Sequence, residues 1–484
     1  MMKRKSLLVI LLAVILSFLQ IGFTAEPVSA ILIEGEVFVS GDYQYQIKND
    51  AAVMISYSGK DEVLRVPDEL GGYPVAEIGR AAFWSCTSLK EVELPDSIET
   101  IGDWAFEESG IEKITLPQNL KIINGGAFWG CRSLKEVDLP DALEIIGRYG
   151  FWGSGIEKIV LPANVKEIEW GAFDDCLNLR EFIFSDNYPV VNMADLFTGS
   201  RQLKKIVLGK NTQTIIPPNY SYYQDNVAYH KPRVEEIVIP DENPYLKNED
   251  HVIYTKDGKT LVYYMLNNTE AQFTVPKSVQ TIGGRAFAGN YSLESVQLPA
   301  SVSKIEPGAF CGCKNLTSIA IPDSVRTIPY ACFQYCKSLK RVNLPPTVKS
   351  VEKNGFGRSL KVLTVGGKNT RFEKKAVYKS TTIVCEKGSQ AAKCKTKINA
   401  RGKHVIYHMG GGVNHADNVY CFTKSFTLKA PTRPGYSYTF AGWYTDAAKT
   451  KKITRVAAGK DYVLYAKWVR QESYKFFDKY KKRS

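Results

Sequence analysis

Residues suited to catalysis and metal binding are scarce in this sequence. Histidine occurs only five times in 484 residues, at His230, His251, His404, His408 and His415. None of them stands in a Ser/His/Asp or Cys/His context, so nucleophilic catalysis is not indicated. His404 and His408 lie in a β-type stretch, where a separation of four residues is too long for easy joint ligation. We therefore predict no catalytic residue, no metal site and no cofactor.

Long apolar runs are absent after the first 30 residues. Residues 1–30 have a basic start, an apolar core from Leu7 to Ile21 and small residues at Val28, Ser29 and Ala30. This pattern is typical of a cleaved secretory signal peptide. A retained membrane anchor is the alternative, but the apolar core is short for a span. We expect an exported mature chain with no transmembrane span.

Acidic residues are depleted at the C-terminal end. Residues 359–484 carry 27 Lys/Arg and 7 Asp/Glu, whereas residues 31–358 carry 33 and 42. A basic end on an acidic body favours attraction to an anionic surface such as a cell wall, although it could serve solubility alone. A nucleic-acid partner does not fit an exported chain whose main body is acidic.

One phrase is repeated many times along the chain. It reads GAFDDCLNLREFIF at residues 171–184 and GAFWGCRSLKEVDL at 126–139. A constant period predicts coils of equal length stacked along one axis, in which each coil buries its apolar side chains only against its neighbours. The phenylalanines of the phrase recur every 22–24 residues in two series: Phe83, Phe106, Phe128, Phe151, Phe173 and Phe197, then Phe287, Phe310, Phe333 and Phe356.

Within one coil, apolar and polar residues alternate after the phenylalanine. Leu134, Val137 and Leu139 alternate with charged residues, which predicts a short strand with one face directed inward. Pro140 would end that strand because it has no N–H for the ladder. A second apolar pair, such as Leu143 and Ile146, would cover the return side of the coil.

The chain divides into segments of different character. A hairpin is expected near 249–265, because Asp257-Gly258 lies between two β-rich runs. The predicted order is a signal peptide (1–30), an N-terminal β cap (31–66), a solenoid with the inserted hairpin (67–372), a linker or irregular cap (373–403), a small β module (404–468) and a basic tail (469–484).

The repeated phrase resembles the leucine-rich repeats of BspA-like bacterial surface proteins. The resemblance covers roughly residues 62–365, where about nine copies agree in spacing and residue type. It departs from the pattern at 198–275, where the coil lengths vary. The resemblance implies a mainly β solenoid with coils of about 22–23 residues, on a secreted or surface protein used for adhesion or protein binding.

The C-terminal module resembles a Listeria–Bacteroides repeat, the B-repeat type of internalins. The motifs that carry the resemblance are Phe440-Ala441-Gly442-Trp443-Tyr444 and Leu464-Tyr465-Ala466-Lys467-Trp468. The resemblance implies a small β-grasp-like domain of a surface protein. The sequence departs from it by two extra residues between Tyr436 and Phe440, where we expect the strand to bulge.

Half of the ten cysteines occupy one position of the repeat. Ser109 and Ser154 fill the same position in other coils, so we interpret it as a small buried site. Disulfides are the alternative in an exported chain, for the pairs Cys313–Cys336 and Cys385–Cys394. The five cysteines at this position are Cys86, Cys131, Cys176, Cys313 and Cys336.

The outward residues of the predicted strands are the first candidates for binding. One outward row alternates in charge, which favours lateral ion pairs: Glu91, Lys113, Glu136, Lys158, Glu181, Lys205 and Glu236. A neighbouring row begins polar and then becomes apolar: Glu93, Thr115, Asp138, Val160, Ile183, Val207 and Val238. Four adjacent apolar residues facing water predict a binding patch, unless a loop from 210–232 covers them or they serve sheet propensity.

Tryptophan is concentrated in the early coils. Five of the seven lie in residues 84–170, and Trp84, Trp129 and Trp152 each follow the repeat phenylalanine. Such a series could stack on sugar rings or bind a protein, or it could pack on the flank of the coils.

These observations predict an exported, non-enzymatic adhesion protein of the extracellular space or cell surface. Its partner would be a host or neighbouring-cell protein or glycan, bound by Val160, Ile183, Val207 and Val238, with the three tryptophans as a second face. A rigid surface of this kind binds at little ordering cost. Two alternatives are a secreted carbohydrate-active enzyme with the repeats as a targeting arm, and a purely structural envelope protein.

Overall fold

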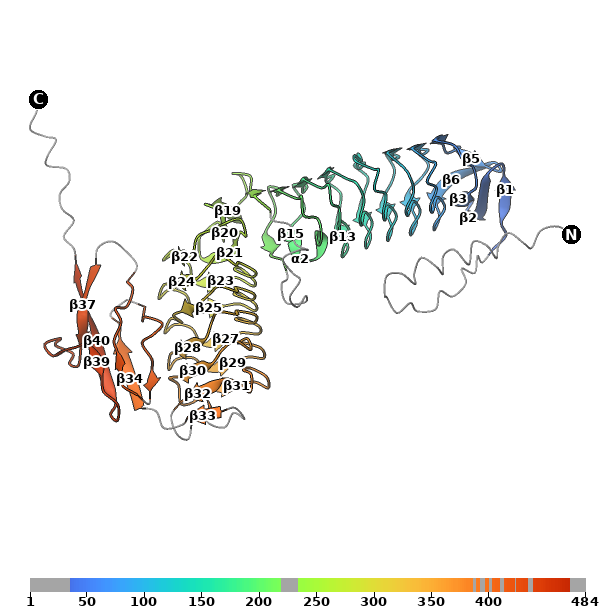
Figure 1. Ribbon diagram of the computed structural model, residues 1–484. Helices are drawn as coiled ribbons and strands as arrows, with labels where there is room; N and C mark the ends of the chain where they lie inside the picture. Colours follow the sequence, from blue (N-terminus) through green and yellow to red (C-terminus); the bar gives the residue numbers. More distant parts are fainter. Residues whose placement is uncertain are drawn as a thin grey trace, which may run out of the picture.

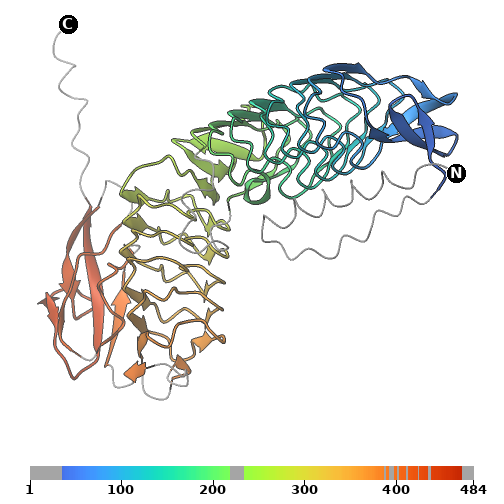
Figure 2. The same cartoon turned by 45° about the vertical axis from the view of Figure 1, so that its right-hand side comes forward.

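The computed structural model shows two β-solenoid limbs that meet at an elbow, and a separate β module beside the second limb (Figure 1). Figure 2 shows the same arrangement from another side. The predicted signal peptide and nearly all of the predicted basic tail lie outside the described residues. The structure describes residues 35–218, 234–385, 389–391, 397–399, 403–409, 413–422, 424–433 and 438–470.

A long sheet lines the return side of the first limb. It starts with three antiparallel strands, and β3 then pairs in parallel with β6, so the N-terminal cap is continuous with the solenoid. Its members are β1 (Phe38–Ser40), β2 (Tyr43–Lys48), β3 (Ala51–Tyr57), β5 (Glu69–Leu70), β6 (Tyr73–Ile78), β8 (Thr100–Ile101), β10 (Ile122–Ile123), β11 (Ile145–Ile146) and β13 (Glu167–Ile168). The next two coils add the parallel pair β15 (Val190–Asn192) and β17 (Thr214–Ile216).

The front side of the first limb carries two shorter parallel sheets. The first consists of β4 (Val63–Arg65), β7 (Glu91–Glu93) and β9 (Lys113–Thr115). The second consists of β12 (Lys158–Val160), β14 (Glu181–Ile183), β16 (Lys205–Val207) and β18 (Glu236–Val238).

The prediction of a strand at 134–139 is wrong. Residues 136–139 make no backbone ladder bond to either adjacent coil among the described residues, and only the Lys135 carbonyl accepts, from the Glu157 N–H at 2.9 Å. Alternation sets which side chains face inward, but a strand also needs hydrogen-bond partners. Val137 and Leu139 are consequently half-buried, whereas the predicted return pair, Leu143 and Ile146, is fully buried.

Stacked phenylalanines form the centre of each limb. In the first limb, rings from Phe83 to Phe173 are nearly parallel, with centroids 4.8–5.4 Å apart. The series is interrupted where Phe182, from the strand side, inserts edge-on between Phe173 and Phe197. The short helix α2 (Met193–Leu196) forms the corner at this point. The second limb repeats the parallel stack from Phe287 to Phe356 at 5.0–5.4 Å.

The elbow is built by three antiparallel strands. They are β19 (Leu246–Glu249), β20 (Val252–Thr255) and β21 (Thr260–Tyr264), and β20 and β21 form the hairpin that Asp257-Gly258 indicates. β21 then pairs in parallel with β23, the first return strand of the second limb.

The second limb continues the same two-sided pattern. Its front strands are β22 (Gln272–Thr274), β24 (Ser295–Gln297), β26 (Ser318–Ile319), β28 (Arg341–Leu344), β30 (Val362–Val365), β32 (Thr382–Val384) and β33 (Lys397–Asn399). Its return strands are β23 (Thr281–Ile282), β25 (Lys304–Ile305), β27 (Thr327–Ile328), β29 (Ser350–Val351) and β31 (Arg371–Phe372). The solenoid spans about 14 turns between residues 52 and 384, a longer range than the predicted 67–372.

The C-terminal module has its own core and a mixed sheet. The strand order is β35-β34-β40-β37-β38; β34 and β40 are parallel and β37 and β40 antiparallel, with a bulge after Phe440. A β-grasp-like classification of the module stays a prediction. The strands are β34 (Lys403–His408), β35 (Cys421–Phe422), β36 (Phe426–Thr427), β37 (Tyr438–Tyr444), β38 (Lys452–Ile453), β39 (Arg455–Val456) and β40 (Tyr462–Arg470).

The repeat cysteines act as small hydrogen-bonding residues in the core. The thiols of Cys131 and Cys176 donate to the carbonyls of Phe106 and Phe151 in the preceding coil, at 3.0 and 3.1 Å. Cys313 and Cys336 donate in the same way to Phe287 and Phe310, and both are free thiols rather than a disulfide. The alternative pair Cys385–Cys394 includes Cys394, which lies outside the described residues.

Candidate functional site

The four apolar candidates lie side by side on the front of the first limb. The parallel register pairs Val160 with Ile183, Ile183 with Val207, and Val207 with Val238. Val160 is 52% exposed, and the other three are half-buried. Their backbone neighbours Ile159, Phe182, Ile206 and Ile237 are buried beneath them, which fixes the direction of the row. We call these four residues the apolar row.

A ladder of opposite charges runs beside the apolar row. Lys158 contacts Glu181 at 2.9 Å, and Lys205 lies 3.7 Å from both Glu181 and Glu236. The hydrogen bond from Lys158 lowers the pKa of Glu181, so this carboxylate stays ionised. The predicted lateral pairing is confirmed for these residues. Exposed pairs stabilise little individually, so the ladder mainly fixes coil register and neutralises this edge of the face.

The segment 210–232, which in the alternative interpretation covers the row, is described only in part. The chain leaves the coil through β17, which ends at Ile216, and residues 219–233 lie outside the described residues. Val207 and Val238 are the members of the row on either side of this segment in sequence.

The same face of the second limb is more polar, and the C-terminal module lies along it (Figures 1 and 2). The positions equivalent to the apolar row are Thr274, Gln297, Ala320, Asn343, Thr364 and Val384, and Thr274 and Gln297 are exposed. The C-terminal module sits along this limb in both views (Figures 1 and 2). A small cavity between them is lined by Thr274, Gln297, Pro299, Thr432 and Arg433.

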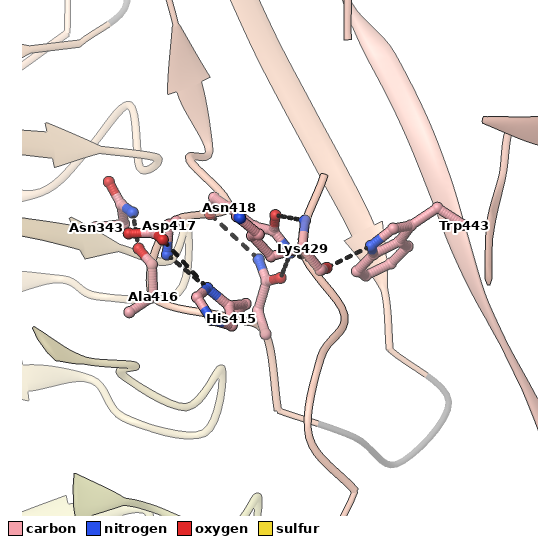
Figure 3. A network of polar contacts seen from close by, with 8 residues as sticks. Asn343, His415, Ala416, Asp417, Asn418, Lys429 and Trp443 are labelled. Carbon is pink, nitrogen blue, oxygen red and sulfur yellow. Dashed lines mark hydrogen bonds and ion pairs between the residues drawn. The ribbon is translucent and has the colours of Figure 1, made fainter. Parts of the chain in front are cut away.

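Three direct contacts hold the module on the second limb. The Asn343 amide donates to the carbonyl of Ala416 (Figure 3). The Tyr420 hydroxyl donates to an Asp323 carboxylate oxygen at 3.2 Å, and burial raises the pKa of Asp323. Gly366 lies against Tyr420, and a Cβ atom at this position would be only 2.8 Å from the Cβ of Tyr420. Because glycine has no Cβ, the backbone of the limb can approach the module closely.

A buried amide inside the module positions the Ala416 carbonyl. Asn418 is fully buried, and its side chain donates to the Lys429 carbonyl at 2.9 Å and accepts from the Lys429 N–H at 2.8 Å. The indole of Trp443 donates to the same Lys429 carbonyl at 2.8 Å (Figure 3). The loop that contacts Asn343 is therefore attached to the module core.

The tryptophans form a second feature on the flank of the first limb. Trp84, Trp129 and Trp152 are half-buried, and the rings of Trp129 and Trp152 lie 4.5 Å apart. Tyr149 links Trp129 to Trp170, with centroid distances of 5.3 and 4.9 Å. The structure thus brings Trp129 and Trp152 together in a continuous aromatic surface, which we call the aromatic flank.

A carboxyl group lies in the middle of the tryptophan row. The Ser85 N–H donates to the Glu107 carbonyl, and the Glu108 N–H donates to the Trp129 carbonyl, both at 2.8 Å. These bonds place Glu107 in the coil between those of Trp84 and Trp129. Burial raises the pKa of Glu107 to about 7, and the adjacent Glu108 adds to the rise. In the described part of the chain its side chain has no hydrogen-bond or ion-pair partner.

Sequence reasoning missed several members of the aromatic flank. Tyr149 and Trp170 belong to it, and the Arg148 guanidinium lies over both rings at 5.0 and 4.8 Å. The sequence signal was available at the position two before the phenylalanine. Tyr149 occupies this position in one coil and Gly171 occupies it in the next coil. A Cβ on Gly171 would lie 2.6 Å from the Tyr149 ring, so only glycine leaves room for that ring.

The histidines do not gather into a site among the described residues. His251 is exposed, His408 stacks on Tyr465 with ring centroids 4.6 Å apart, and His415 lies 3.7 Å from Asp417. The described residues contain no cluster of three or more potential metal ligands. His230 and the side chain of His404 lie outside the description.

The parallel coils, the phenylalanine stacks and the exposed front strands define a leucine-rich-repeat solenoid protein with a C-terminal β module. Residues 72–180, 107–228 and 260–384 match the BspA type leucine rich repeat region in six copies, and residues 404–467 match the Listeria-Bacteroides repeat domain. The chain belongs to the BspA-type leucine-rich-repeat proteins. These matches identify no catalytic domain.

Several solved structures are similar to the chain. A leucine-rich repeat protein from Bacteroides ovatus is 24% identical over 75% of this chain and 99% of its own, with a TM-score of 0.47. The leucine rich repeat protein of T. pallidum is 34% identical over 36% of this chain and 86% of its own, with a TM-score of 0.33. A leucine rich cell surface protein from Faecalibacterium prausnitzii is 20% identical over 75% and 93%, with a TM-score of 0.37.

No curated protein matches the chain. Within the described residues, no helix has the length and apolar character that a membrane crossing requires.

Proposed function

We propose that this chain is an exported, cell-surface adhesion protein, and that the front face of its first limb binds a partner protein. The observation that carries the proposal is the apolar row. Its four β-branched residues are aligned on successive strands of one rigid sheet, and Val160 is 52% exposed. Aligned apolar side chains on a preformed surface can bind with little loss of conformational entropy.

The contrast between the two limbs supports a binding role for the first. In the second limb Thr274, Gln297, Asn343 and Thr364 occupy equivalent positions and are polar, and Asn343 is bound by the module. Ala320 and Val384 are the apolar exceptions. Sheet propensity alone does not require an apolar residue here, because the β-branched threonines Thr274 and Thr364 stand at the equivalent positions of the second limb. The difference therefore favours selection of the apolar row for contact with a partner. Cell-surface residence is part of the proposal. It is supported by the name of the F. prausnitzii relative and by the basic end of this chain, which would be attracted to an anionic wall.

A substitution within the row tests the proposal. Immobilised mature protein is probed with a panel of extracellular-matrix proteins and wall glycans, in the wild type and in Val207→Asp. A buried carboxylate in the interface should weaken binding of the cognate protein by about ten-fold or more. Val190→Asp is the matched control, because Val190 is a 40% exposed valine on the return side of the same limb. Equal loss in both variants would contradict a site at the row.

The aromatic flank is a second candidate surface, for glycans. Trp84, Trp129 and Trp152 are half-buried rather than buried, and Glu107 between them offers an unpaired carboxyl to sugar hydroxyls. Loss of glycan binding in Trp129→Ala, with protein binding kept, would assign glycans to this flank. A purely structural role would instead leave every panel member unbound by the wild type.

A further inference from the structure

The C-terminal module presents an open sheet face on the side opposite its core. Val405, Tyr407, Leu464 and Ala466 point into the core and are buried. Between them, Ile406 and Val463 pair across β34 and β40 and are 51% and 40% exposed. Two residues further along these strands, the stacked pair His408 and Tyr465 extends the same outer face.

The module and the first limb differ strongly in charge. Residues 404–468 contain 9 Lys/Arg and 3 Asp/Glu, a net charge of +6. Residues 35–218 of the first limb contain 17 Lys/Arg and 28 Asp/Glu, a net charge of −11. The second limb, residues 234–385, contains 20 and 13, a net charge of +7. The basic module therefore finds charge complementarity in the first limb and not in the limb on which it sits.

The two faces also match in chemistry. The apolar row of the first limb continues along the front side into the exposed acids Asp138 and Glu93. The outer face of the module combines the apolar pair Ile406 and Val463 with Lys467, which lies over the Tyr444 ring at 5.4 Å. An apolar centre with opposite charges around it is the usual pattern of a specific protein contact.

Within one molecule these faces cannot meet. Tyr420 and Asn343 hold the module on the second limb, beyond the elbow from the first limb (Figure 1). We propose that the protein self-associates head to tail, with the apolar row of one copy bound to the outer module face of a second copy. This rests on the proposed function and names its partner. Because the two faces differ, a dimer keeps one free row and one free module face, and the contact can repeat along a chain of copies.

Complementary variants test the direction of the contact. Val160→Lys places a cation in the row of the acidic limb, and Val463→Glu places an anion on the basic module; both valines are exposed, so the fold should be kept. In sedimentation velocity at low salt, the wild type should form dimers and larger species that dissociate at about 0.5 M salt. Each variant alone should be monomeric, with association weakened by about ten-fold or more.

Mixing the two variants gives the decisive result. Val160→Lys keeps an intact module face and Val463→Glu an intact row, so the mixture should regain association through these two faces. Val39→Lys, at a 68% exposed valine of β1, should assemble like the wild type. A monomeric wild type at low salt, or a mixture that stays monomeric, overturns self-association. In that case loss of a different partner in Val207→Asp would still support the proposed function, and its retention would reject both.

Discussion

Ile253 and Tyr254 are consecutive residues of β20, yet their side chains lie in two different hydrophobic cores. Ile253 packs with the first limb, and Tyr254 packs with the second. Successive side chains of a strand point to opposite faces, so a single hairpin can close one solenoid and open the next. The elbow is therefore a shared cap whose two faces replace the missing neighbouring coils.

We predict that Asn243→Ala weakens the elbow. Asn243 is fully buried; its amide donates to the carbonyls of Gly209 and Thr212, and its oxygen accepts from the N–H groups of Tyr245 and Leu246. Removing these bonds takes away the side-chain partner of four backbone groups, of which the Gly209 carbonyl still accepts from the Thr212 N–H. The Thr212 carbonyl and the Leu246 N–H lie in buried residues, so the free energy of unfolding should fall by about 2–4 kcal/mol. Urea unfolding followed by tryptophan fluorescence measures the loss.

Asn315→Ala is the matched control for the elbow. Asn315 is exposed and makes a single bond to the Tyr291 carbonyl at 2.6 Å. Loss of this hydrogen bond should lower the free energy of unfolding by less than about 1 kcal/mol, because water can hydrogen-bond to the freed carbonyl. Equal costs for both variants would mean that Asn243 does not fix the elbow.

Local spacing was sufficient to predict the solenoid and the elbow hairpin. The phenylalanine period reflects the length of one coil, and Asp257-Gly258 favours a tight turn whatever the tertiary context. The prediction of a strand at 134–139 was wrong because a strand needs hydrogen-bond partners in the adjacent coils. The alternation of apolar and polar residues carries no information about these partners. The register of the apolar row was predictable because equal coils stack in register.

The docking of the module was not predictable from the sequence. Asn343 and Ala416 are 73 residues apart and have no shared motif. Their contact depends on the path of the chain after the last coils, where the repeat pattern fades. The aromatic flank was found only in part, because Tyr149 and Trp170 do not follow the repeat phenylalanine and their contacts depend on small residues in the next coil.

Tyr264→Phe should maintain or raise stability. Tyr264 is fully buried, and its ring packs on Phe273 and Phe287 at 4.7 and 5.2 Å. Its hydroxyl has no hydrogen-bond partner in the described part of the chain. Phenylalanine keeps the ring and removes the buried hydroxyl, which should add about 1 kcal/mol to the free energy of unfolding. A loss of about 1 kcal/mol or more would show that the hydroxyl makes a stabilising hydrogen bond. Differential scanning calorimetry distinguishes the outcomes.

Native alkylation should separate Cys86 from the buried repeat cysteines. Burial raises the pKa of the half-buried Cys86 thiol, and it raises the pKa of the fully buried Cys131 and Cys176 thiols to about 12. The thiolate is the reactive form, so at pH 8 these two thiols are almost entirely protonated as well as inaccessible. Peptide mass mapping after iodoacetamide should show Cys86 labelled first and all three labelled in urea. Equal native rates would contradict the buried positions.

Glu107→Gln should stabilise the protein at alkaline but not at acidic pH. Burial raises the pKa of Glu107 to about 7 in the folded state, whereas the unfolded value is about 4.3. A raised carboxyl pKa means that folding favours the protonated form of Glu107. The contribution of this group to the free energy of unfolding is therefore fully present below about pH 4 and is lost as the pH rises through 7. At pH 8 the variant should therefore be more stable than the wild type by about 1–3 kcal/mol, and at pH 4 nearly equal to it. Melting temperatures across this pH range measure the effect. Glu112→Gln, at an exposed ion-paired residue of the same coil, is the control. Parallel pH profiles for the wild type and Glu107→Gln would mean that this carboxyl titrates as a solvated group.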